Sequence, residues 1–134
     1  MLKLAVSALR EPINHVLITA TNTSKSHCRL NGYPFLKYDP DQQAPVAAAD
    51  ATKPATTIDL APGDSAYAGV LTSSADGSGK NGKDRPTIDL QLASVAGGGL
   101  PGSPSKLAMP KGAQYVDDSA MVTYWVTDLQ AALY

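Results

Sequence analysis

The sequence is poor in the residues on which most enzymes, disulfide-stabilised proteins and membrane proteins depend. Its 134 residues include one cysteine, two histidines and one tryptophan, and no apolar run approaches the roughly 20 residues that cross a membrane. Because Cys28 stands alone, no disulfide can form within the chain, and the cysteine count does not reveal the compartment. Eleven Lys and Arg against twelve Asp and Glu give a net charge of −1, so we expect no nucleic-acid partner.

Turn-forming residues are abundant instead. Eleven Gly and ten Pro interrupt the chain often, and its length fits a single domain over residues 1–134. Residues 2–8 alternate apolar and other side chains, which predicts a strand; Lys3 interrupts the apolar stretch that a secretory signal would need. A second alternating run over 13–21 ends at Asn22-Thr23-Ser24, a turn sequence, so the two runs are predicted to form a hairpin.

Further short strands are predicted between turn signals. The segments 57–60 and 66–71 flank Ala61-Pro62-Gly63-Asp64, which suits a type II turn, and we expect them to form a second strand pair. Residues 44–55 and 73–83 carry too few large apolar side chains to offset their ordering entropy. Both are predicted to be mobile loops.

The strongest strand signal is residues 121–127, which are β-branched and aromatic. A period of two places Val122, Tyr124 and Val126 on a core-facing side. The outward side, which we take as the candidate binding surface, then carries Met121, Thr123, Trp125 and Thr127. The alternative is that Trp125 packs in the core and Tyr124 faces outward with its hydroxyl in water.

The overall pattern predicts an all-β, antiparallel sandwich of about seven to eight strands, with helix at most in residues 128–134. The residues that we expect to be mostly buried are Leu4, Val6, Val16, Ile18, Leu30, Ile58, Leu60, Ile88, Leu90, Val122 and Val126.

Side chains that could carry chemistry are scattered. His15 and His27 could approach each other from neighbouring strands, but no close His–Met spacing accompanies Met109 or Met121, so we predict no metal site and no cofactor. Cys28 alternates with exposed positions and is expected to point inward as an unreactive thiol. No nucleophile elbow or phosphate loop is present, and carboxylates such as Asp117 are expected in turns, so we predict no catalytic residues.

The aromatic side chains can be interpreted in two ways. Core filling explains most of them, whereas a subset could form a platform for a carbohydrate or peptide because flat rings give contact area at low entropy cost. The residues concerned are Tyr33, Phe35, Tyr38, Tyr67, Tyr115, Tyr124 and Trp125.

Three segments resemble a known family in their order and spacing: residues 21–24 (TNTS), residues 28–34 (CRLNGYP) and residues 60–66 (LAPGDSA). Over roughly residues 2–72 the chain resembles the secreted and lipid-anchored actinobacterial proteins grouped as domain of unknown function 4232. The resemblance implies an extracytoplasmic, immunoglobulin-like sandwich with no established activity, and it supplies no catalytic residues. Members commonly have a second cysteine, so the resemblance makes Cys28 half of a bridge whose partner this chain lacks.

These observations favour a non-enzymatic extracytoplasmic domain, secreted or anchored at the cell surface, that binds an unknown protein or surface polymer. The alternative is a self-associating structural module, which would form a homodimer. A small metal carrier or hydrolase has less support, because it needs converging polar side chains.

Overall fold

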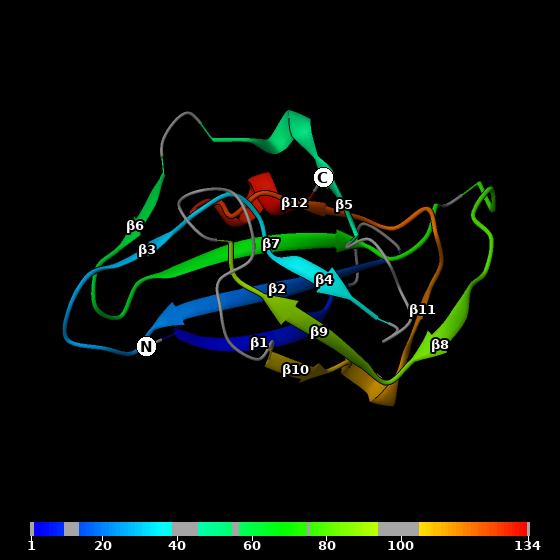
Figure 1. The fold of residues 1–134 in the computed structure, drawn as a ribbon, viewed down its shortest axis with the longest axis horizontal. Helices are drawn as coiled ribbons and strands as arrows, with labels where there is room; N and C mark the ends of the chain where they lie inside the picture. Colours follow the sequence, from blue (N-terminus) through cyan, green and yellow to red (C-terminus); the bar gives the residue numbers. More distant parts are fainter. Residues whose placement is uncertain are drawn as a thin grey trace.

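A five-stranded sheet forms one layer of the protein (Figure 1). It belongs to a computed structural model that describes residues 2–9, 14–38, 46–54, 57–74, 76–93 and 105–133. In spatial order its strands are β1 (Leu2–Ala8), β2 (His15–Asn22), β7 (Ser65–Leu71), β12 (Met121–Thr123) and β5 (Ala47–Ala49). All neighbours are antiparallel except β12 and β5, which are parallel.

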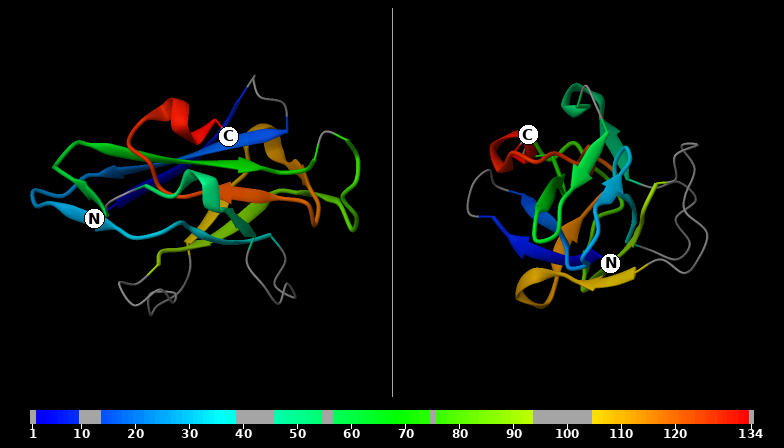
Figure 2. Two further views of the ribbon diagram at one scale, coloured as in Figure 1. Left: turned by 90° about the horizontal axis from the view of Figure 1, so that it is seen from above. Right: turned by 90° about the vertical axis from the view of Figure 1, so that its left-hand side faces the viewer.

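A three-stranded sheet forms the opposite layer, and two strand pairs lie at the ends of the molecule (Figures 1 and 2). The sheet contains β10 (Ser105–Ala108), β9 (Thr87–Gln91) and β4 (Phe35–Lys37). The pairs are β3 (Cys28–Leu30) with β6 (Ile58–Leu60), and β8 (Lys83–Arg85) with β11 (Gln114–Val116). Three 3-10 turns complete the elements: η1 (Asp50–Thr52), η2 (Pro110–Gly112) and η3 (Leu129–Ala132).

The predicted all-β, mostly antiparallel class is confirmed. The described strands outnumber the predicted seven to eight, because β5 forms in a segment expected to be a loop and β8, β10 and β11 form where no strand was predicted. The immunoglobulin-like arrangement stays a prediction. No helix in the described part of the chain is long and apolar enough to cross a membrane.

The core lies between the two layers and follows the predicted alternation. The β1–β2 hairpin is confirmed, with Leu2 opposite Asn22 and Ala8 opposite Val16. Of the predicted core, nine residues are buried: Val16, Ile18, Leu30, Ile58, Leu60, Ile88, Leu90, Val122 and Val126. Leu4 and Val6 are only partly buried, because β1 is an edge strand and is covered less completely than the strands inside the sheet.

The outer face of the five-stranded sheet has its own cover, the turn η3 (Figure 2). Ala132 of η3, Val126 and Leu17 of β2 form a small apolar cluster there. The approach is so close that a Cβ at Gly69 would collide with the backbone carbonyl of Ala132. Glycine at this position of β7 is therefore a packing requirement.

The turn before β7 is confirmed, but the strand pair predicted around it is wrong. Gly63 has a φ of +86°, as the third position of a type II turn requires, and the Asp64 N–H donates to the Ala61 carbonyl at 3.0 Å. Nevertheless β6 pairs with β3, whereas β7 pairs with β2 and β12. The turn thus carries the chain from one strand group to another.

Asn22, at the end of β2, is the physical reason for this crossing. Its side chain is fully buried, and its amide donates to the carbonyls of Leu60 at 2.9 Å and Ser26 at 2.7 Å. Its backbone N–H donates to the Asp64 carbonyl at 2.9 Å. These bonds tie both ends of the turn to β2, so the strands leave it in different directions.

The two predicted loops are more structured than expected. Within 46–54, Val46 and Ala49 are buried and β5 pairs with β12, so this segment is ordered against the rest of the protein despite its few large apolar side chains. Asp118 holds the other segment: its carboxylate accepts from the Lys80 N–H at 2.7 Å, and its N–H donates to the Lys80 carbonyl at 3.0 Å. The mobility of both segments stays a prediction, and residues 44, 45, 55 and 75 lie outside the described residues.

Candidate functional site

The outward direction predicted on the last strand is wrong for Trp125, and Thr123 lies on the outer side but is covered. Trp125 is 0% exposed and Thr123 is 2% exposed, whereas Met121 is half-buried and Thr127 is exposed. Trp125 therefore packs in the core and the half-buried Tyr124 lies nearer the surface, which is the alternative that the sequence left open.

The alternation fails because β12 ends at Thr123. The Thr123 hydroxyl accepts a hydrogen bond from the Gly69 N–H at 3.0 Å and donates to the Tyr124 carbonyl at 2.9 Å. Beyond this point the backbone N–H of Trp125 donates to the Gly32 carbonyl at 3.0 Å, and Val126 forms an isolated antiparallel β-bridge with Tyr67. A period of two applies only while the ladder continues, so Val122 and Trp125 both turn into the core.

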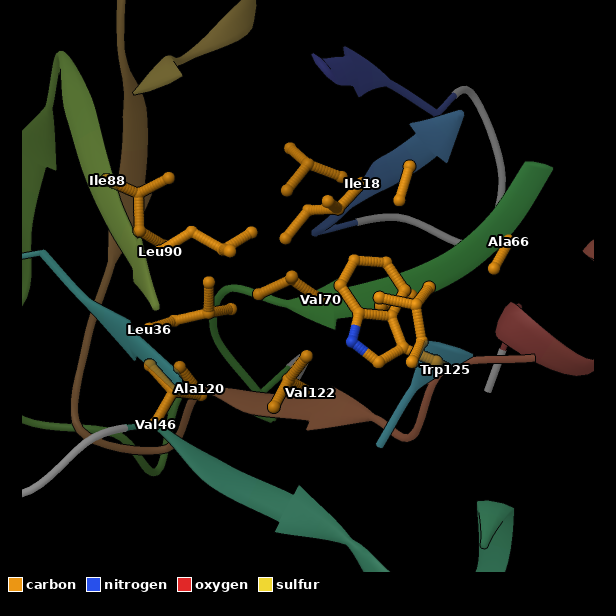
Figure 3. Packing of buried hydrophobic residues seen from close by; sticks show 14 of the residues in the cluster. Ile18, Leu36, Val46, Ala66, Val70, Ile88, Leu90, Ala120, Val122 and Trp125 are labelled. Atoms are coloured by element: carbon orange, nitrogen blue, oxygen red, sulfur yellow. The ribbon is translucent and has the colours of Figure 1, made fainter. Parts of the chain in front are cut away.

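Trp125 is a structural residue. Figure 3 shows its ring among Ile18, Val70 and Val122. Its indole nitrogen is buried and has no hydrogen-bond partner within the described structure. A buried N–H without a partner costs free energy, so Trp125 fills the core but leaves one buried hydrogen-bond donor unsatisfied.

Tyr124 belongs to a group of three aromatic rings, Tyr33, Phe35 and Tyr124, which we call the aromatic cluster. The Tyr33 and Tyr124 centroids lie 5.1 Å apart with ring planes at 74°, and the Tyr33 and Phe35 centroids lie 5.2 Å apart at 73°. All three side chains are half-buried. The cluster is the place where the structure brings together members of the predicted aromatic set at the surface.

Backbone hydrogen bonds assemble the cluster from distant parts of the chain. The bond from Trp125 to Gly32 brings the segment containing Tyr33 against the segment containing Tyr124. Gly32 adopts a φ of +58° just before Tyr33, which suits glycine, and Phe35 begins the edge strand β4.

The turn η1 lies next to the aromatic cluster. The Tyr124 N–H donates to the Thr52 hydroxyl at 2.9 Å, and that hydroxyl donates to the Ala49 carbonyl at 2.6 Å. These bonds hold Asp50, which begins η1 and is exposed, beside the Tyr124 side chain.

One carboxylate, that of Asp50, acts on the ionisation of Tyr124 in the cluster. Burial raises the pKa of Tyr124 above its ordinary value of 10.0, and the negative charge of Asp50, the nearby Tyr33 hydroxyl and a hydrogen bond to Asp50 raise this pKa further. Tyr124 is therefore neutral at physiological pH, and the Asp50 carboxylate lies close enough to affect its ionisation. The Asp50 carboxylate retains further lone pairs for another donor.

The histidines and Cys28 do not converge. His15 and Asn22 begin and end β2, about 23 Å apart at about 3.3 Å per residue, and His27 follows the turn that is bonded to Asn22. His27 faces Asp59 at 3.4 Å, with both side chains exposed. Cys28 is half-buried rather than buried, because it lies in the two-stranded β3–β6 pair. Among the described residues, no three His, Cys, Asp or Glu side chains are placed to hold a metal ion.

Other polar side chains serve the fold. Asp117 is buried, and its carboxylate accepts from the N–H and the hydroxyl of Ser119, whose hydroxyl oxygen in turn accepts from the Ser74 N–H at 2.8 Å. Met121 lines a small apolar depression on the outer face of the five-stranded sheet. The remaining lining residues are His15, Ala49, Gly69, Leu71, Val122 and Thr123.

Comparison with known proteins extends the resemblance found in the sequence. A family model described as Domain of unknown function (DUF4232) matches residues 2–126, and so continues past residue 72 through β12 to the bridge at Val126. No curated protein and no solved structure matches. Because the matched region covers most of the chain, this protein belongs to the DUF4232 family, a domain of unknown function.

Proposed function

We propose that this chain is a non-enzymatic domain that works outside the cytoplasm and binds a protein or surface polymer through its aromatic cluster. The observation that carries the proposal is the position of Tyr33, which contacts both Phe35 and Tyr124, in a group of three half-buried rings. Aromatic side chains concentrate binding energy in interfaces because they bury a large area and lose few rotamers.

The cluster is better suited to binding than the depression around Met121. The depression is mainly apolar and small, whereas the cluster combines ring surface with the exposed carboxylate of Asp50. Binding sites commonly pair apolar area with a few directed polar groups, which set orientation and specificity. Trp125 is buried, so the surface predicted around it supports neither partner binding nor self-association through that side chain.

The non-enzymatic part of the proposal is supported by how the polar side chains are used. Asp117 and Ser119 bond to each other within a turn, Asp118 clamps the segment around Lys80, and His27 faces Asp59 in solvent. General acid–base work needs groups that face a substrate in a defined geometry, whereas Asp117, Ser119 and Asp118 hold turns and loops and the His27–Asp59 pair is exposed to solvent.

The location outside the cytoplasm rests on the character of the proteins that the sequence resembles. Fractionation of the source cells with an antibody against this chain tests it directly. We expect the protein in the envelope or culture-medium fractions. Recovery in the cytoplasmic fraction alone would refute this part of the proposal while leaving the binding surface open to test.

Binding is tested by co-sedimentation with isolated envelope material from the same cells. The variants are Phe35→Leu and Tyr124→Leu, which remove ring surface but keep apolar volume, and the matched control is Tyr115→Leu, because Tyr115 is 48% exposed on β11. We expect each cluster variant to weaken binding about tenfold, as loss of a hot-spot residue does, and the control to bind as the parent does.

Protease treatment of the envelope material separates the two partner classes. Loss of binding after treatment identifies a protein partner, and retention identifies a polymer. Equal binding by the parent and both cluster variants would show that the aromatic cluster is not the binding surface.

A further inference from the structure

The angles between the ring planes of the aromatic cluster limit the chemical class of ligand that it can bind. A sugar ring stacks on an exposed flat face, and an extended sugar platform needs rings that are nearly coplanar. Here Phe35 and Tyr124 are each tilted by more than 70° from Tyr33. In such edge-to-face contacts the positive edge of one ring meets the negative face of another, and the face of the ring that offers its edge is not covered by that contact.

The partly exposed rings and the nearby carboxylate favour the same sign of charge in a ligand. The face of a tyrosine or phenylalanine ring attracts a cation within about 6 Å of its centre. Asp50 adds a full negative charge beside Tyr124, and the Tyr33 hydroxyl lies in the same neighbourhood. The Asp50 carboxylate would repel an anionic group placed beside it.

We infer that the aromatic cluster, together with Asp50, binds a primary alkylammonium group, the chemistry of a lysine side chain. The inference rests on the proposed function, because it names the ligand group for the same surface. Asp50 is exposed and lies close enough to Tyr124 for its charge to act on the phenol. Its remaining lone pairs can accept from an N–H of a primary ammonium, whereas a quaternary ammonium has no proton to donate.

The rise in the pKa of Tyr124 agrees with this assignment. Burial is its largest cause and the negative charge of Asp50 the next, and both disfavour a phenolate beside the carboxylate. A bound ammonium would reverse the second effect, since a positive charge stabilises the phenolate.

The direct test is an NMR titration of the full chain with n-butylammonium chloride at constant ionic strength, following the ring protons of Tyr33, Phe35 and Tyr124. The neutral comparison ligand is 1-butanol, which has a similar chain without the charge. We expect saturable shifts confined to the cluster and binding about tenfold tighter for the cation, the order of a cation–π contact assisted by a carboxylate.

Two variants test whether the Asp50 carboxylate accounts for the preference for the cation. Asp50→Asn keeps the size of the side chain and is expected to bring n-butylammonium binding down to about the level of 1-butanol. Tyr115→Phe, outside the cluster, is expected to bind as the parent does. A dispersed amide spectrum of each variant shows that it is folded.

Each other outcome overturns a defined part of the inference. Tetramethylammonium binding as tightly as n-butylammonium would reassign the site to quaternary ammonium groups. Methyl glucoside binding more tightly than either cation would make the cluster a sugar site, and absence of saturable binding by any cation would end the inference. If envelope binding still depends on Phe35 and Tyr124, the proposed function survives that result; if it does not, both fail.

Discussion

Replacement of Trp125 is the sharpest test of how the last strand is placed. Trp125→Ala removes the largest fully buried side chain in the described core. Truncation of a buried tryptophan costs about 3–5 kcal/mol, because apolar contacts are lost and a cavity remains. Against a typical free energy of unfolding of about 5–15 kcal/mol, this is a large fraction of the total stability.

Trp125→Phe separates the two contributions of the indole ring. Phenylalanine lacks about two carbons of packing, worth roughly 1.6 kcal/mol at about 0.8 kcal/mol per buried carbon. It also removes the indole N–H, which has no partner here and whose desolvation costs about 1–3 kcal/mol. The two effects nearly cancel, so we expect Trp125→Phe to lie within about 1 kcal/mol of the parent.

Urea unfolding followed by far-ultraviolet circular dichroism measures both variants without relying on the tryptophan signal. With a slope near 2 kcal/mol per molar urea, Trp125→Ala should lower the midpoint by about 2 M. The control Tyr115→Ala, at an exposed position, should change stability by less than about 0.5 kcal/mol. A Trp125→Ala variant as stable as the parent would mean that Trp125 is not in the core.

Three further predictions concern other positions. Asn22→Ala leaves buried carbonyl groups without their donor and should cost about 1–3 kcal/mol in the same urea assay; an unchanged midpoint would contradict the role of Asn22 in the chain crossing. Gly69→Ala should displace η3 from the outer face, because its Cβ collides with the Ala132 carbonyl, and limited proteolysis should then cut near the C-terminus sooner than in the parent. The raised pKa of Tyr124 means that the folded state holds this proton more tightly than the unfolded state, so the associated stability is present below pH 10.0 and is lost as the pH rises through the folded pKa. Urea unfolding measured across this pH range should show the loss. Asp50→Asn should reduce the loss but not abolish it, because burial is the larger cause of the raised pKa.

Local patterns in the sequence determined the fold class and most of the core. Alternation over residues 2–8 and 13–21 predicted the β1–β2 hairpin, and it placed Val16 and Ile18 inside correctly. These inferences succeed because a strand with one buried face must repeat every two residues, which is visible without knowledge of its partners. The turn at Pro62-Gly63 was predictable for a similar reason, since its backbone conformation depends on the residues themselves.

Tertiary pairing decided what the local patterns could not. The alanines of β5 carry no strand signal and form a strand only because β12 offers them a partner edge. The direction of Trp125 depended on where β12 ends, which a hydrogen bond between Thr123 and Gly69 fixes. The candidate site depended on the same kind of contact, because Tyr33 and Tyr124 meet where the backbone N–H of Trp125 bonds to the Gly32 carbonyl. No period or motif in either segment predicts a hydrogen bond between residues so far apart in the chain.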